Sequence, residues 1–148
     1  MSPAERICPT LTVPSNPRML SIARTFVESV CQARQVDRTT IHAIVLATGE
    51  AVTNIVRHAH RDCPDASFQI QCHVGPETVE VILMDQGVPF NLSQVPHMEP
   101  GELRLGGRGV YLMRILMDEL SCQPLGDRGN RLRMVKRWPS KNCSRDCG

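Results

Sequence analysis

The segment from Thr39 to about His60 has the clearest hydrophobic periodicity in the chain and predicts a helix. Advancing about 100° per residue, a set of apolar positions and one threonine fall within roughly 60° of Ile41. These positions are Ile41, Ile44, Val45, Thr48, Val52, Ile55, Val56 and Ala59. Asp37 is placed to cap the first turn. We expect this stripe to be the face that the helix turns toward the core.

Two polar residues, Glu50 and Asn54, share the opposite face of this predicted helix. They are four residues apart, at about 180° and 220° from Ile41 on the same wheel. Ala43 and Ala47 lie beside them, so no long side chain blocks access to the acid and the amide. Periodicity alone favours an ordinary solvated face here over a binding face.

Weaker patterns predict the elements before and after this helix. Residues from about Glu5 to Val13 alternate and predict an edge strand. Asn16 followed by Pro17 is typical of a helix start, and we expect a helix through about Arg34. Residues 66–74 alternate as a half-buried strand, with Phe68, Ile70, Cys72 and Val74 on one face. Thr78 to Met84 is more apolar and completes an antiparallel hairpin.

The second half of the chain contains a long stretch without periodicity. Residues 88–105 carry three prolines and a glycine and predict a long loop, a type that is often functional. The glycines of residues 106–109 end this loop and open an amphipathic helix marked by Val110, Met113, Leu116, Met117 and Leu120. Residues 120–123 and 130–138 predict a final hairpin around a turn at 126–129.

The order of these elements predicts an α+β fold. Strand, two helices, two strands, loop, helix and two strands give a two-layer α/β sandwich, with the helices on one face of a mostly antiparallel, mixed sheet. We expect residues 1–138 to form a single domain and residues 139–148 to be a polar, disordered tail.

Composition narrows the functional classes. With 41% hydrophobic but only 3% aromatic residues, the core must be aliphatic. A net charge of +2 is too small to indicate nucleic-acid binding. The basic residues crowd toward the C-terminal end, and we interpret them as a solvated strand face and tail. They are Arg128, Arg131, Arg133, Lys136, Arg137, Lys141 and Arg145.

The cysteines and the apolar runs indicate a cytoplasmic location. Seven scattered cysteines without a CxxC pair suit a reducing compartment. No apolar run is long enough to span a membrane, and the N-terminus has no signal-peptide pattern. His58, His60 and Cys63 are close in sequence, but a fourth zinc ligand is not apparent, so structural histidines are favoured over a metal site.

Candidate chemistry lies in three ordered segments, each of which is weak alone. They are residues 50–59, which read EAVTNIVRHA, residues 85–90, which read DQGVPF, and residues 106–117 with their glycines. Together they resemble the N-box, the G1 segment and the G2 segment of the GHKL (Bergerat-fold) ATPase superfamily. Within it, the chain resembles the RsbW-type anti-sigma-factor serine kinases. The resemblance spans most of the chain and implies the Bergerat ATP-binding fold.

This resemblance implies a site for ATP and Mg²⁺. Asn54 would hold Mg²⁺, which prefers oxygen ligands, together with the phosphates. Asp85 would accept a hydrogen bond from the adenine amino group, and Gly87 would leave room for the purine. Backbone N–H groups of Gly106, Gly107, Arg108 and Gly109 would face the phosphates at a helix N-terminus. Residues 88–105 would be the lid.

The resemblance also implies phosphoryl transfer. Glu50 would be the general base that takes the proton of a partner serine. The family's lid arginine aligns with neither Arg104 nor Arg108 unambiguously, and Arg104 is slightly preferred. Three positions depart from the family pattern: Asn130 replaces a common threonine, Pro89 replaces a common glycine, and Gly49 replaces a common serine or threonine. Gly49 bears on catalysis more than on ATP binding.

Two functions therefore compete. The first is an ATP-dependent protein serine/threonine kinase that phosphorylates an anti-sigma-factor antagonist and sequesters a sigma factor by turns, with a homodimer among the assemblies that the resemblance implies. The second is a non-catalytic module that binds nucleotide and switches partners without turnover, which Gly49 and Asn130 favour. A P-loop ATPase is excluded because GxxxxGK[ST] is absent.

Overall fold

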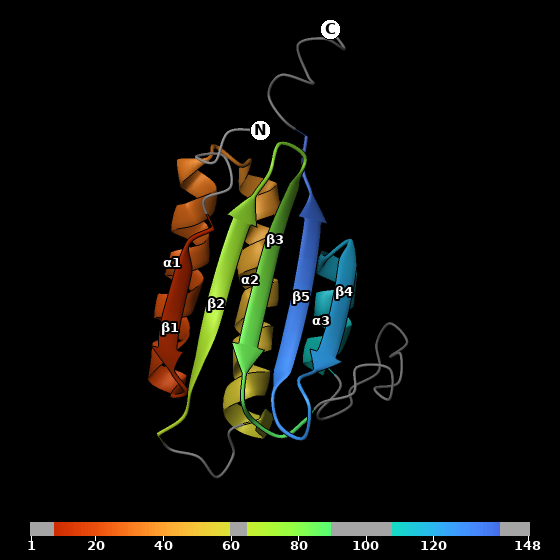
Figure 1. The fold of residues 1–148 in the computed structure, drawn as a ribbon. Coiled ribbons are helices and arrows are strands. Elements are labelled where there is room, and N and C mark those ends of the chain that lie inside the picture. The colour runs from red at the N-terminus through yellow and green to blue at the C-terminus, as the bar shows by residue number, and fades with distance from the viewer. Residues whose placement is uncertain (1–7, 60–64, 90–107, 140–148) are drawn as a thin grey trace, which may run out of the picture.

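Five antiparallel strands form one layer of the structure, and the helices cover one face of them (Figure 1). The computed structural model describes residues 8–59, 65–89 and 108–139. The strand order is β1-β2-β3-β5-β4, so β1 and β4 are the edges. The strands are β1 (Thr10–Pro14), β2 (Ser67–Val74), β3 (Thr78–Asp85), β4 (Glu119–Pro124) and β5 (Asn130–Arg137). The predicted α+β architecture is confirmed.

The first two helices begin where the sequence predicts. A 3₁₀ turn, η2 (Pro17–Met19), precedes α1 (Leu20–Ala33), and the side chain of Asn16 accepts a hydrogen bond of 2.9 Å from the N–H of Arg18. The side chain of Asp37 accepts 3.0 Å from the N–H of Thr40 and so caps α2 (Arg38–Asn54). Each cap satisfies an N–H group that a helix start leaves without a partner. The third helix is α3 (Arg108–Leu116).

The aliphatic core lies between the helices and the inner face of the sheet. Alternation in β2 buries Phe68, Ile70, Cys72 and Val74, as predicted. From the helices, Ala23, Val27, Ile44, Val52, Val110 and Met113 complete the core. Cys31 and Cys72 are both buried in it and pack as small hydrophobic residues.

Two predicted helix ends and part of the predicted core stripe are wrong. The long helix leaves regular α geometry after Asn54 and continues as a π-helical turn, η3 (Ile55–Ala59). Leu120 belongs to β4, because the third helix ends at Leu116 and two residues separate it from the strand. Ile41, Val45 and Val56 of the predicted core stripe are only half-buried. The predicted tail lies outside the described residues apart from Pro139.

The outer face of the sheet carries a small apolar strip. Ile82 and Val135 are almost fully buried, yet they alternate with core residues and therefore point away from the helices. Arg133, the strand partner of Ile82, forms ion pairs with Glu80 and Glu119 on this side. The positive charge of Arg133, on the predicted basic strand face, is thus balanced by two acids. The long side chains of these residues shield the apolar strip from solvent.

The helical segment Arg38–Arg57 is long and apolar enough to cross a membrane by length and composition alone. In the fold it is the central helix of its layer, with α1 and α3 packed against it (Figure 1). Its apolar residues, such as Ile44 and Val52, belong to the same core as the sheet. A core helix of this kind meets such a criterion without being a membrane span.

Candidate functional site

Four chain segments that are far apart in the sequence meet at one end of the molecule. The end of β3, the start of β5, the last turns of α2 and the first turn of α3 all lie there (Figure 1). This placement follows from the antiparallel order, because β3 runs toward the end at which β5 begins. The three segments that resemble nucleotide-binding motifs therefore share one region.

Glu50 and Asn54 meet the first turn of α3. An atom at the Cβ position of Gly109 would lie 2.9 Å from Oε2 of Glu50 and 3.5 Å from both Oδ1 and Nδ2 of Asn54. A side chain at residue 109 would therefore require the Glu50 carboxylate to move from this position. The expectation of a solvated face is wrong: both residues are half-buried, and Ala47 and Ala51 beside them are fully buried.

Asn54 is the last residue before the π-helical turn. Insertions of π geometry into α-helices are often found at functional sites, because they change the direction of the side chains that follow. The hydroxyl of the preceding residue, Thr53, donates 2.9 Å to the carbonyl of Gly49 one turn earlier, a bond that can bend a helix. The amide of Asn54 is thus set at a local change of helix geometry.

Asp85 ends β3 and is only 5% exposed. Its Oδ1 accepts two hydrogen bonds, 2.8 Å from the N–H of Gly87 and 3.1 Å from Nδ2 of Asn130. Within the described residues, no group donates to Oδ2. Both of these bonds fall on Oδ1, which leaves Oδ2 available as an acceptor for a ligand or for water. Asp85 is therefore a fitting acceptor for a base amino group.

The turn between β4 and β5 holds the segment that follows Asp85. The N–H of Gly129 donates 2.7 Å to the carbonyl of Gly87, and Nε of Arg128 donates 3.3 Å to the carbonyl of Gln86. Gly129 has φ +105°, and a Cβ atom there would lie 3.0 Å from the carbonyl oxygen of Asp85. Glycine is required at this position both for its conformation and for its contact.

The thiol of Cys122 is close enough to Asp85 for the charge of that carboxylate to affect it. Burial raises its pKa to about 11, and the negative charge of Asp85 adds to the effect. A thiol with so high a pKa is protonated at neutral pH and is a weak nucleophile. Cys122 is therefore a packing residue beside the site.

Of the glycine-rich segment, the structure describes Arg108 and Gly109. Arg108 is exposed and is the first residue of α3. Arg104, Gly106 and Gly107 lie outside the described residues, as does most of the predicted lid. The contribution of these residues to the site stays a prediction.

Gly49 is covered by a cation from the neighbouring helix. A Cβ atom at Gly49 would lie 2.7 Å from Nε and 2.8 Å from an Nη atom of Arg24 on α1. The space that a serine or threonine would fill is thus occupied by a guanidinium group, one residue away from Glu50.

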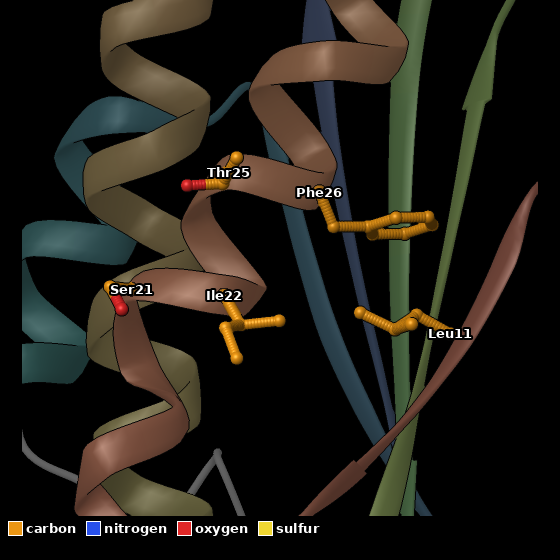
Figure 2. Close-up of a pocket in the computed structure, with 5 residues that line it drawn as sticks. All are labelled: Leu11, Ser21, Ile22, Thr25 and Phe26. Atoms are coloured by element: carbon orange, nitrogen blue, oxygen red, sulfur yellow. The ribbon is translucent and has the colours of Figure 1, made fainter.

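A pocket lies away from these residues, between α1 and the edge strand β1 (Figure 2). Leu11 of β1 and Ile22 and Phe26 of α1 give it an apolar lining, to which Ser21 and Thr25 of α1 also contribute. None of the predicted site residues lines it. The described residues contain no group of three or more His, Cys, Asp or Glu that could hold a metal ion, and His60 and Cys63 lie outside them.

Comparison with known proteins identifies the family. The sequence profile of the histidine kinase-like ATPase domain matches residues 13–136. The chain is 31% identical over 121 residues to the serine-protein kinase RsbW of Bacillus subtilis, covering 76% of each chain. The chain belongs to the RsbW-type branch of the histidine kinase-like ATPase family. RsbW of Listeria innocua is also similar to this RsbW-type chain, with 29% identity over 119 residues and 75% and 76% coverage.

Solved structures agree on the fold of this RsbW-type protein. One match, with a TM-score of 0.68 and 14% identity, is in the SiaB–SiaC complex of Pseudomonas aeruginosa and covers 89% of this chain and 90% of that one. The RsbU and RsbW domains of Rv1364c from Mycobacterium tuberculosis match with a TM-score of 0.65 and 16% identity over 90% of this chain and 34% of that one. At such identities the likeness shows the fold alone.

Sequence reasoning underrated one residue of this RsbW-type site. Asn130 enters the sequence argument only as a departure from the family pattern, whereas the structure places it against Asp85. Its position at the start of the last strand was a usable signal, because the antiparallel β3–β5 pair puts it directly opposite Asp85. Finding it required the strand register, which periodicity does not give.

Proposed function

We propose that this RsbW-type protein is an ATP-dependent protein serine/threonine kinase whose substrate is an anti-sigma-factor antagonist. The contact between Glu50 and Gly109 carries the proposal, because it sets a carboxylate against the N-terminus of α3 with Asn54 one helical turn away. A base, an amide and the backbone N–H groups of a helix N-terminus in one place suit phosphoryl transfer to a hydroxyl. Family membership supports the use of ATP.

The base of ATP is recognised at Asp85. Oδ2 of Asp85 accepts a hydrogen bond from the adenine amino group, while Oδ1 remains bound to Gly87 and Asn130. Gly87 is buried and has no side chain that would compete for the space. A base with a carbonyl in place of the amino group would face this acceptor with another acceptor, so it is rejected.

The phosphates are held at the start of α3, where N–H groups and the helix dipole favour negative charge. Gly106, Gly107, Arg108 and Gly109 supply these groups in the proposal. Mg²⁺, held through Asn54, would neutralise charge on the phosphate oxygens. Of the two arginines, Arg104 is preferred for the γ-phosphate and Arg108 is the alternative.

In the transfer step, the hydroxyl oxygen of the partner serine bonds to the γ-phosphorus as the bond to the β–γ bridging oxygen breaks, and ADP leaves. Glu50 accepts the hydroxyl proton. Its half-buried position between α2 and α3 fixes the direction from which the serine must approach. Positioning accounts for most of the rate in reactions of this type.

The partners follow from the same proposal. An antagonist protein presents the serine. A sigma factor is the second partner, which the protein sequesters in turn with the antagonist. Relatives named serine-protein kinase support the first assignment. A homodimer and a cytoplasmic location are part of the proposal, and neither nucleic acid nor membrane is a direct partner.

The test is phosphoryl transfer from γ-labelled ATP with Mg²⁺ to the antagonist proteins of the source organism. Wild type is expected to label a partner serine, and Glu50→Gln to lose transfer by at least about a hundredfold while it still binds ATP. Glu77→Gln, an exposed change in the turn between β2 and β3 at the other end of the sheet, is the matched control. ATP binding at saturation without transfer to any partner would contradict the kinase.

That outcome would instead favour a non-catalytic module that binds nucleotide and switches partners. One observation supports this second function. The guanidinium of Arg24 lies on Gly49, next to Glu50, so the place where the family commonly has a hydroxyl holds a cation from another helix. Such a module would bind its antagonist with a nucleotide-dependent affinity, and it would release the partner unmodified.

A further inference from the structure

We propose that Asn130 is a positioning residue for base recognition, which acts by fixing the carboxylate of Asp85. This inference rests on the proposed ATP site and concerns how that site tells one purine from another. Asn130 and Asp85 are direct partners in the β3–β5 register, and both are almost fully buried, at 3% and 5% exposure.

The amide nitrogen of Asn130 makes two hydrogen bonds. Nδ2 donates 3.1 Å to Oδ1 of Asp85 and 2.9 Å to the carbonyl oxygen of Val88. Both partners are acceptors, so the side chain must present its NH₂ group to them, and chemistry fixes the orientation of the amide. One residue thus links the carboxylate to the backbone three residues further along the chain.

A threonine at this position could not make the same pair of bonds. Its hydroxyl has a single hydrogen to donate, whereas the two acceptors require two. Asn130 therefore donates to both the Asp85 carboxylate and the Val88 carbonyl, whereas a threonine could donate to only one of them. The departure from the family pattern at residue 130 is a gain of one donor.

These bonds decide which oxygen of Asp85 is offered to a ligand. Oδ1 already accepts from Gly87 and Asn130, so the remaining acceptor is Oδ2. Rotation of the carboxyl group would break the bond to Asn130 inside a buried site, where an unpaired polar group is costly. The carboxylate is held in one orientation, and Oδ2 is presented as an acceptor to a base that carries an amino group.

The binding preference for ATP over inosine triphosphate measures directly whether Oδ2 of Asp85 accepts from the base. The base of inosine triphosphate has a carbonyl where adenine has its amino group. In wild type we expect Mg-ATP to bind at least about tenfold more tightly. Asn130→Leu removes both donors and is expected to reduce the preference several-fold. Asn130→Thr restores one donor and should give an intermediate preference.

A coupling measurement separates positioning from a merely structural role. In an Asp85→Asn background, Asn130→Leu should leave the ratio of the two affinities unchanged, because the carboxylate through which Asn130 acts is gone. If Asn130 only stabilised the fold, its loss would weaken both nucleotides by the same factor and leave the ratio intact in either background. That result would overturn the inference.

The two possible failures can be told apart. A wild-type chain that binds Mg-ATP and inosine triphosphate equally would refute the proposed base site, and this inference with it. A wild-type chain that prefers ATP, with the same preference in Asn130→Leu and Asn130→Thr, would refute the inference alone. Thermal unfolding of each variant shows that the comparison is made on folded protein, and Asn130→Thr keeps the test decisive if Asn130→Leu does not fold.

Discussion

Gly109 and Glu50 are in contact across the α2–α3 interface, so that a Cβ atom at Gly109 would lie 2.9 Å from Oε2 of Glu50. The atom it would meet is the far end of a flexible side chain, whereas the two helix backbones need not move. The Glu50 carboxylate can occupy this position because residue 109 is glycine and has no Cβ atom.

Gly109→Ala should therefore reduce phosphoryl transfer without unfolding the protein. The new methyl group displaces the Glu50 carboxylate, and a small displacement of a catalytic group costs about ten- to a hundredfold in rate. Alanine is also favoured over glycine in a helix, so the unfolding midpoint should hardly change. Gly75→Ala is the control, because its Cβ would make ordinary contacts of 3.6 Å with Thr78. Equal transfer rates in the two variants would show that Glu50 is not held by this contact.

Gly49→Ala should raise the free energy of unfolding by up to about 1 kcal/mol, because alanine replaces glycine inside α2. The atoms it would meet belong to the exposed and flexible end of Arg24, which can move into solvent. Urea titration of wild type and variant, alone and with Arg24→Ala, measures the effect. A loss of stability that disappears with Arg24→Ala would mean that the guanidinium is fixed over Gly49.

Gly129 and Gly126 form a matched pair in the turn between β4 and β5. Both have positive φ, at +105° and +86°, but only Gly129 is crowded, with the Asp85 carbonyl 3.0 Å from its Cβ position. We expect Gly126→Ala to cost about 1 kcal/mol from backbone strain and Gly129→Ala to cost at least about 2 kcal/mol. Gly129→Ala should also weaken ATP binding, because it moves the backbone of Asp85. Equal costs in chemical denaturation would contradict this account of the turn.

The thiol of Cys122 should make stability fall at alkaline pH. Burial and the nearby charge of Asp85 raise its pKa to about 11, from 9.0 in the unfolded chain. Between these values the folded state binds more protons than the unfolded state, so the free energy of unfolding decreases as pH rises from about 9 to about 11. Partial solvent access limits the loss to about 1 kcal/mol. Cys122→Ala should remove this part of the slope in urea titrations across the range, and an unchanged slope would contradict it.

The sequence was sufficient for the order and type of the elements. Local patterns predicted these elements correctly. The structure contains the alternating burial in residues 67–74 and the helix caps at Asn16 and Asp37. Leu120 was misplaced because a helical spacing of apolar residues continued by chance into the next strand.

The environment of Glu50 could not be predicted from the same helix. A helical wheel reports one apolar stripe, whereas α2 is covered by the sheet and also by α1 and α3. Ala47 and Ala51 are fully buried although they lie outside the predicted apolar stripe. The link between Asp85 and Asn130 depends on strand register, which forms only when segments 45 residues apart pair.

Titration with Mg-ATP and with Mg-GTP, on wild type and on Asp85→Asn, tests most directly whether these segments form one nucleotide site. Wild type should bind ATP at least about tenfold more tightly than GTP, and Asp85→Asn should lose that preference, because an amide can donate to the guanine carbonyl where a carboxylate cannot. Asp127→Asn, an exposed change in the neighbouring turn, should leave the preference intact. Equal affinities in wild type, or a preference that survives in Asp85→Asn, would contradict the account.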